Sequence, residues 1–407
     1  MESVPTPVEF NPLTTEFRVD PHPSYRQLRE VDPVHWSPFL GFWVLTRYAD
    51  CVSVLRDAKR FSVDPRDLAI YETLMQGVGE QRPLVQMERK WMLMLNPPDH
   101  TRLRTLVTKA FTPRVVENMR PRIQAITDEL LDRVQPAGRM DIIADLSFPL
   151  PVIVIAQMLG VPAEDRDKFK SWTTDLARTL DPIISPEVLD AGDAATLAFT
   201  DYFKTLVAKR RKDPQDDLLS ALIVAEEKGE RLTEEELIAT AVLLLGAGHE
   251  TTMNLIGNGM LALFRHPDQM GKLRADSSLI ANAVEECLRF DGPVQMTART
   301  AVEDVEIDGK AITKGQQAVI VLAAANRDPA QFAHPDQFNI AREENPHIAF
   351  SHGIHYCLGA PLARGEAQIV INTLLRRLPN LRLATEELEW RDTVTIRGLK
   401  SLPVLFS

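Results

Sequence analysis

Cysteine is scarce in this chain. Its 407 residues include only Cys51, Cys287 and Cys357, which are too few to form a disulfide framework in a protein of this size. An odd number also leaves at least one thiol unpaired. The sequence therefore suits a reducing compartment, and we expect a cytoplasmic protein.

Long apolar runs are also missing. The longest uncharged stretch, residues 146–163, is interrupted by prolines and Gly160 and is shorter than the roughly 20 residues that a membrane-spanning helix needs. Residues 1–17 carry three glutamates and three prolines, whereas a secretion signal begins with a basic segment followed by an apolar one. We expect a soluble protein with no membrane partner.

Positive charge is in the minority. Lys and Arg number 46 against 57 Asp and Glu, a net charge of −11 that argues against binding nucleic acid through bulk phosphate attraction. Hydrophobic residues make up 44% of the chain, which excludes a disordered protein. The length would allow two or three domains. Because no linker, repeat or low-complexity tract divides the chain, we predict one domain over residues 1–407.

Helical periodicity dominates the chain, and strand patterns are few. The predicted fold is mainly α with small β-sheets (α+β). The β-rich part covers about residues 1–65, 297–325 and 380–407, and the helical body covers about 66–296 and 326–379. Strands are expected at 34–36 and 42–45, at 305–307 and 310–312 around the turn Asp308-Gly309, and at 317–322. Helices are expected at 25–30, 48–57, 100–111, 115–134, 152–159, 164–179, 194–212, 218–228, 279–290 and 360–378.

One further helix, predicted from Thr233 to about His266, is unusually long. Thr233 and Glu236 match a capping box, and Pro267 ends the segment. At 1.5 Å per residue it would run roughly 50 Å, and its apolar middle indicates that it crosses the core. Polar residues at 249–252 follow two glycines at this midpoint. The pattern predicts that the buried helix serves a polar site.

Cys357 lies just before the helix predicted over 360–378. The free N–H groups and positive dipole end of a helix N-terminus stabilise a thiolate, so we expect the pKa of Cys357 to be lowered. Gly353 and Gly359 permit tight turns and the close approach of a flat ligand. A cysteine taken alone is more often a small buried apolar residue, and this is our interpretation of Cys51 and Cys287.

These residues resemble the cytochromes P450, the haem-thiolate monooxygenases. The resemblance covers nearly the whole chain and implies the P450 fold, with a long central helix across the haem. The matching segments are the cysteine loop (Phe350-x-x-Gly353-x-His355-x-Cys357-x-Gly359), the Glu-x-x-Arg motif (Glu286 and Arg289), the meander (Pro335 to Phe338 with Arg342), the oxygen-binding motif (Ala247 to Thr252) and the early haem-contacting segment (Pro97 to Arg104).

The resemblance implies a cofactor site. Cys357 would be the axial thiolate ligand of haem b, Phe350 would pack beside it, and the N–H group of Gly359 would point at the sulfur. Four further residues would bind the haem propionates: His100, Arg104, Arg299 and His355. The alternative for each of the four is an ordinary surface or core side chain.

Glu250 and Thr251 would form the catalytic acid–alcohol pair. Reduction of O₂ needs two protons in a mostly dry pocket, and a hydroxyl that relays protons from a carboxylate meets that need. Gly246 and Gly248 would let the helix widen locally. In the alternative reading, Thr251 bonds back to a carbonyl of its own helix and Glu250 lies near solvent. His249 is interpreted as a packing or hydrogen-bonding residue.

By the same resemblance, Glu286, Arg289 and Arg342 form a buried network. The ceiling of the substrate pocket would come from residues 66–94 and 172–189. Its apolar lining predicts a hydrophobic or amphipathic small molecule, although core packing explains the same residues. The expected pocket residues are Val85, Leu243, Ala247, Val294, Met296 and Leu399.

The implied activity is insertion of one oxygen atom from O₂ into a C–H bond or alkene. Electrons would come ultimately from NAD(P)H through a reductase and a ferredoxin, and we expect a monomer. The ferredoxin would dock on a basic patch formed by Arg102, Lys109, Arg114, His347, His352 and Arg364.

Three alternatives stay open at this point. They are a peroxide-driven or oxygen-independent haem enzyme of the same fold, a haem sensor without turnover, and a helical protein that binds no haem.

Overall fold

The computed structural model describes residues 10–166, 168–181, 184–225 and 229–407, and most of these lie in helices. The fold is mainly α with small sheets, as predicted. The helices are α1 (Thr15–Val19), α2 (His22–Val31), α3 (Tyr48–Arg56), α4 (Tyr71–Val78), α5 (Pro83–Glu88), α6 (Asp99–Ala110), α7 (Pro113–Val134), α8 (Pro149–Met158), α9 (Lys168–Arg178), α10 (Pro186–Lys212), α11 (Leu218–Val224), α12 (Glu234–Arg265), α13 (Pro267–Ala275), α14 (Ile280–Asp291), α15 (Leu322–Ala325) and α16 (Ala360–Arg377).

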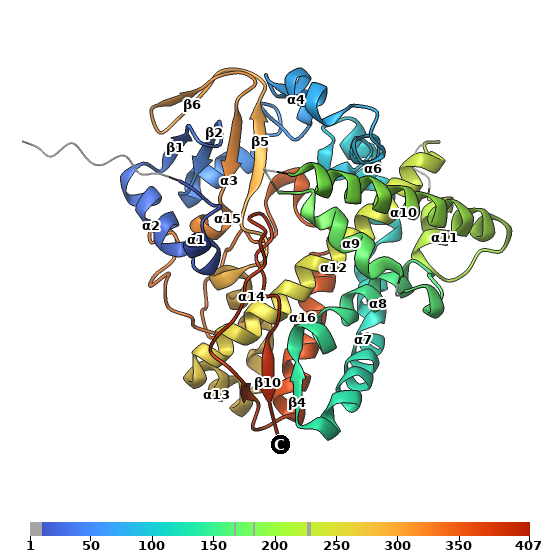
Figure 1. Cartoon of the computed structure of the whole chain (residues 1–407), viewed down its shortest axis with the longest axis vertical. Helices are drawn as coiled ribbons and strands as arrows, with labels where there is room; N and C mark the ends of the chain where they lie inside the picture. Colours follow the sequence, from blue (N-terminus) through green and yellow to red (C-terminus); the bar gives the residue numbers. More distant parts are fainter. Residues whose placement is uncertain (1–9, 167, 182–183, 226–228) are drawn as a thin grey trace, which may run out of the picture.

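The strands form one larger and two smaller sheets. The larger sheet has the order β1-β2-β8-β5-β3, with β2 and β8 parallel and the other pairs antiparallel. It lies beside the N-terminal helices at the upper left of Figure 1. The strands are β1 (Val34–Ser37), β2 (Phe42–Leu45), β3 (Phe61–Ser62), β4 (Arg139–Asp141), β5 (Thr297–Ala301), β6 (Val305–Ile307), β7 (Lys310–Ile312), β8 (Gln317–Ile320), β9 (Arg382–Leu383) and β10 (Pro403–Leu405).

Several boundaries differ from the sequence prediction. Helix α10 begins at Pro186 rather than at residue 194, because Ser185 caps it by accepting the N–H of Val188. The prediction gave no separate helix for α1, α4, α5, α13 or α15 and no separate strand for β3, β4, β5, β9 or β10. Strand β5 lies in the part expected to be β-rich, but its sequence TARTA lacks a β-branched run. The helix predicted over 218–228 ends at Val224, and residues 226–228 lie outside the described part. The described residues from 10 to 65, expected to be β-rich, hold the three helices α1, α2 and α3 as well as strands.

Helix α12 is the axis of the helical body and runs diagonally through it in yellow in Figure 1. Its predicted capping box is present: the Thr233 hydroxyl accepts the N–H of Glu236, and the Glu236 carboxylate accepts the N–H of Thr233. Helices α8, α9, α14 and α16 pack against it. Most of its residues between Leu237 and Leu263 are buried, so burial on nearly every face stabilises this long helix.

The expected widening of α12 at its glycines is not observed, and the helix stays α-helical from Glu234 to Arg265. The π-helical turn of the described chain lies at Ile142–Ser147 instead, just before α8. Among the described residues, no helix combines the length and apolar character needed to cross a membrane.

Candidate active site

The loop before α16 holds Cys357 in a defined turn. The N–H of Cys357 donates to the carbonyl of Phe350 at 3.0 Å, which closes the loop. Gly353 has φ +71°, and a Cβ there would lie 2.4 Å from the carbonyl oxygen of Leu55, so this position requires glycine. The Arg364 guanidinium stacks 4.5 Å from the centre of the Phe350 ring. The sulfur is thus held at the N-terminus of α16.

The protein environment does not by itself make Cys357 a thiolate, in contrast to the expectation from sequence. Cys357 is accessible to a water-sized sphere, yet the surrounding protein shields it from bulk solvent, and this desolvation raises the pKa of its thiol. The N–H groups of Gly359 and Ala360 and the charge of Arg104 oppose the rise. A metal cation would supply the missing stabilisation, because a coordinating thiol loses its proton.

Four basic side chains gather beside this loop. The rings of His100 and His355 lie 4.3 Å apart, and Arg104 donates to the carbonyl of Tyr356 at 2.7 Å. Arg299, in strand β5, donates to the carbonyl of Ala298 at 2.7 Å. Among the described residues, none of these four forms an ion pair with an acidic side chain.

Burial lowers the pKa of all four basic groups. Burial lowers the pKa of Arg299 to about 10. The pKa of His355 falls to about 3, because burial and the charges of Arg299, His100 and Arg104 all disfavour its protonated form. Nε2 of His100 is buried without a hydrogen-bond partner. A ligand with two carboxylates, as in the propionates of haem, fits this donor set.

Glu250 is buried between two other elements, with 2% of its surface exposed. Arg391, from the C-terminal loop, donates to its Oε2 at 2.5 Å, and Thr174, from α9, donates to its Oε1 at 3.2 Å. The position near solvent that the alternative reading gave Glu250 is therefore wrong. Thr251, however, does bond back to its own helix, donating to the carbonyl of Ala247 at 2.7 Å.

His249 satisfies both of its ring nitrogens inside the protein. Nδ1 lies 2.9 Å from the Thr173 hydroxyl, and Nε2 lies 3.2 Å from the carbonyl of Phe148. Burial lowers its pKa to about 3, so the ring is neutral. In this state Nε2–H donates to Phe148 and Nδ1 accepts from Thr173. The interpretation of His249 as a hydrogen-bonding residue is confirmed.

Ala247 is exposed although it lies in the middle of a helix that is otherwise buried. Gly246 and Gly248 on either side are partly exposed. This turn of α12 is therefore open to a water-sized sphere, as Cys357 is. Such an opening suits a flat cofactor with substrate above it.

Glu286, Arg289 and Arg342 form one buried ion-pair network. Arg289 donates to both carboxylate oxygens of Glu286 at 2.8 Å, and Arg342 donates to Glu286 Oε2 at 3.1 Å. The remaining donors of Arg289 reach the carbonyls of Asn326, Pro335 and Gln337. The network joins α14 to the meander segment.

The expected pocket residues do not belong to one cluster. Leu243 and Leu399 are part of the large core around α12, whereas Met296 packs with the N-terminal helices and Val294 packs against the second core cluster. Val85 is partly buried in α5, and Ala247 is exposed. The shared lining of a substrate pocket stays a prediction for these six.

Three polar residues of this region were missed from the sequence: Thr174, Arg391 and Asn254. Arg391 lies 141 positions from Glu250, and no local pattern connects them. Asn254 could have been found, because it follows Glu250 by one helical turn in an apolar segment.

Comparison with known proteins decides the family, because the cytochrome P450 family model matches residues 35–381. The chain belongs to the cytochrome P450 family. It is 45% identical over 395 residues to the biotin biosynthesis cytochrome P450 of Bacillus subtilis, covering 97% of this chain and 98% of the relative. It is 43% identical over 394 residues to the vitamin D(3) 25-hydroxylase of Pseudonocardia autotrophica, covering 95% and 94%.

A solved P450 structure has the same fold. P450BioI, in complex with an acyl carrier protein carrying hexadec-9Z-enoic acid, superposes with a TM-score of 0.90 at 44% identity, covering 96% of this chain and 99% of that one. The chain is thus a cytochrome P450 monooxygenase, an oxidoreductase whose family uses haem with cysteine-thiolate ligation and O₂.

Proposed function

We propose that this P450 inserts one oxygen atom from O₂ into a C–H bond or alkene of a hydrophobic small molecule. The observation that carries the proposal is the uncompensated basic cluster beside Cys357. Haem held there would bind and activate O₂, with the thiolate donating electron density to the iron. His100, Arg104, Arg299 and His355 would hold the propionates, and Phe350 would limit the access of water to the sulfur.

The chain's own part in the chemistry is proton delivery. Glu250 and Thr251 are adjacent on α12, next to the exposed turn at Ala247. Rotation of the Thr251 side chain would release its hydroxyl from the Ala247 carbonyl and turn it toward this opening. The Glu250 carboxylate would then take a proton from water and pass it on to replace the one that the hydroxyl gives up. The presence of the acid–alcohol pair favours this oxygen-dependent reaction over a peroxide-driven or oxygen-independent one, which needs no proton-relay alcohol.

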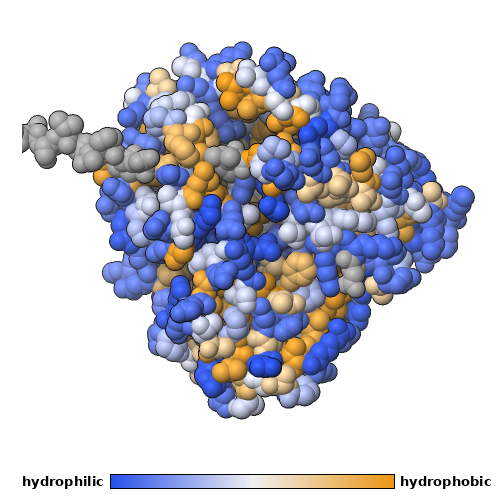
Figure 2. All heavy atoms as spheres, viewed as in Figure 1, coloured by the Kyte–Doolittle hydropathy of each residue, from blue (hydrophilic) through white to orange (hydrophobic). Residues whose placement is uncertain are grey.

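The substrate is inferred to be an apolar or amphipathic molecule. Figure 2 shows apolar surface near the top of the molecule, where Figure 1 labels α4. In this part of the chain Ile70 and Leu74 are 57% and 42% exposed. They belong to the segment expected to form the pocket ceiling. The fatty acyl chain bound to P450BioI and the vitamin D(3) for which the second relative is named differ greatly in structure, so a screen should include fatty acids, a carrier-bound acyl chain and a secosteroid.

Electrons would come from NAD(P)H through a reductase and a ferredoxin-type donor. The predicted docking patch is partly neutralised within the chain: Arg102 pairs with Glu236, and His347 and Arg364 both pair with Glu285. Exposed Arg114, Ile354 and Tyr356 lie in or beside the same segments. A partner with a mildly acidic, partly apolar surface fits them best.

Carbon monoxide binding to the reduced protein tests the proposal. A thiolate-ligated haem gives a strongly red-shifted Soret band, and Cys357→Ala should abolish it. Cys287→Ala is the matched control, because that thiol is buried and its substitution should keep the band. The proposal fails if the wild-type protein lacks the band or if Cys357→Ala retains it.

The proton relay is tested by coupling. Thr251→Ala should consume electrons at a similar rate but form several-fold less product and release peroxide, because the hydroxyl is lost. Thr252→Val, a buried neighbour on the same helix, is the control and should remain coupled. Product formed per electron pair is the measurement, and full coupling in Thr251→Ala would remove Thr251 from the relay.

A further inference from the structure

The strongest unexplained feature is a column of polar side chains along α12. Glu250, Asn254 and Asn258 are spaced by four residues and therefore lie on one face of the helix. Asn254 is completely buried, and neither its Oδ1 nor its Nδ2 has a hydrogen-bond partner in the described part of the chain. Asn258 donates to the carbonyls of Asp291 and Arg397, but its Oδ1 is also unpartnered.

An unpartnered amide in a protein core normally indicates an ordered water molecule. An apolar residue of similar size would pack at Asn254 without any loss of hydrogen bonds. The amide can both accept and donate, so it can hold a water molecule in a fixed orientation.

The C-terminal loop covers this column closely. A Cβ at Gly398 would lie 1.9 Å from Oδ1 of Asn254, so only glycine allows the loop to pass here. The carbonyl of Gly398 accepts the N–H of Arg391 at 2.9 Å, and the Arg391 side chain pairs with Glu250. One loop therefore contacts two successive turns of α12, at Glu250 and at Asn254.

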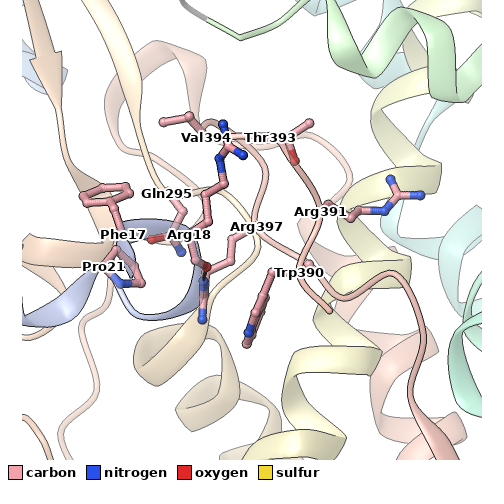
Figure 3. Close-up of a pocket in the computed structure, with 10 residues that line it drawn as sticks. Phe17, Arg18, Pro21, Gln295, Trp390, Arg391, Thr393, Val394 and Arg397 are labelled. Carbon is pink, nitrogen blue, oxygen red and sulfur yellow. Dashed lines mark hydrogen bonds between the residues drawn. The ribbon is translucent and has the colours of Figure 1, made fainter. Parts of the chain in front are cut away.

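The same loop lines a small pocket that it shares with the N-terminal segment around Arg18. Figure 3 shows Arg391 extending from the pocket region toward the yellow helix, α12. The pocket offers about 10 Å³ to the centres of water-sized spheres, room for about one water molecule. Its lining includes Arg18, Gln295, Arg391, Arg397 and Gly398. Gly398 thus separates the pocket from Asn254.

We propose that Asn254 is a positioning residue for the proton supply of Glu250. Water held by its amide delivers protons to the Glu250 carboxylate one helical turn away. The Glu250 carboxylate, ion-paired with Arg391, takes a proton from this water and passes it to Thr251, and the water is reprotonated by the solvent behind it. Arg391 lines the pocket and pairs with Glu250, and its charge holds the Glu250 carboxylate in place. The inference rests on the proposed role of Glu250.

Asn254→Leu tests this path, because leucine has a similar volume and holds no water. With O₂ and the electron donor, product formation should fall by about 10-fold, a modest part of what positioned acid catalysis provides. The solvent deuterium isotope effect on product formation should increase. Peroxide-supported turnover should be unchanged, since peroxide brings its own protons and electrons.

Two further variants isolate the role of the amide. Met253→Leu is the matched control: Met253 is fully buried in the same helix, and its variant should behave as wild type. Asn254→Asp keeps the shape and a hydrogen-bonding group and should restore most of the rate.

High-resolution crystal structures supply a readout that needs no turnover. Water should lie within hydrogen-bond distance of Asn254 in wild type, and no water should occupy this place in the Asn254→Leu variant.

The outcomes separate this inference from the proposed function. The inference is overturned if Asn254→Leu matches Met253→Leu in O₂-supported rate and isotope effect, or if wild-type crystals show no water at the amide. Equal losses in O₂-supported and peroxide-supported turnover would also overturn it, because they indicate general damage. A wild-type protein without the thiolate band would overturn the proposed function instead, and the crystallographic result would still decide whether Asn254 holds water.

Discussion

Two groups of charged side chains in this P450 differ in how their charge is balanced. Around Glu286, one carboxylate is shared by Arg289 and Arg342, and the spare donors reach backbone carbonyls. Around Arg299, two arginines and two histidines meet with no acidic partner in the described residues. The first group is complete within the chain and therefore fixes shape. The second is complete only with an anionic ligand, so it is the one that identifies a binding site.

The largest effect should come from breaking the complete network. Glu286→Ala leaves two buried guanidinium groups without a counter-charge and should destabilise the protein by about 3–5 kcal/mol. Urea unfolding measures the loss. Glu129→Gln is the control, because its exposed pair with Arg133 should contribute less than about 1 kcal/mol. A similar, small loss in both variants would contradict the contrast between the two groups.

Removing Arg299 from the incomplete group should preserve or raise the stability of the haem-free chain and weaken the retention of haem. Arg299→Gln relieves an unpaired buried charge, so the haem-free chain should be as stable as wild type or more stable. The holoprotein should release haem about 10–100-fold faster, because one charge-assisted hydrogen bond of about 1.5–3 kcal/mol is lost. Transfer of haem to a scavenger protein gives this rate. Unchanged haem release with a less stable haem-free chain would make Arg299 a purely structural residue.

His249 is a third kind of buried polar group, because its neutral ring makes both of its hydrogen bonds within the protein. Burial holds the pKa of His249 near 3, against 6.5 when unfolded, so the unfolded state takes up a proton first as the pH falls. Wild type should therefore lose about 1 kcal/mol more stability between pH 7 and pH 5.5 than His249→Gln, which can make both hydrogen bonds. Urea unfolding at the two pH values measures the difference, and equal losses would mean that His249 is protonated in the folded protein.

Local patterns predicted the parts of the molecule that local interactions form. The capping box of α12 and the hairpin at Asp308-Gly309 could be read from neighbouring residues, and the order of the motifs identified the cysteine loop. Strand β5 could not be predicted, because TARTA becomes a strand only through its pairing with β8 and β3.

Two features of the site that depend on distant residues were not predicted correctly: one ion pair was missed, and one pKa shift was expected in the wrong direction. The ion pair of Glu250 with Arg391 joins positions 141 residues apart. The pKa of Cys357 was expected to fall from the helix N-terminus alone, but shielding by the folded protein outweighs the backbone N–H groups. Both depend on the three-dimensional surroundings of a side chain rather than on its neighbours in sequence.

The scarcity of cysteine also has a practical consequence. Cys51 and Cys287 are buried within the core, whereas Cys357 is accessible. A thiol-alkylating reagent applied to the folded, haem-free chain would therefore label a single position, and occupancy of the site would protect it. The protein thus carries its own chemical reporter of cofactor loading, with no engineered label required.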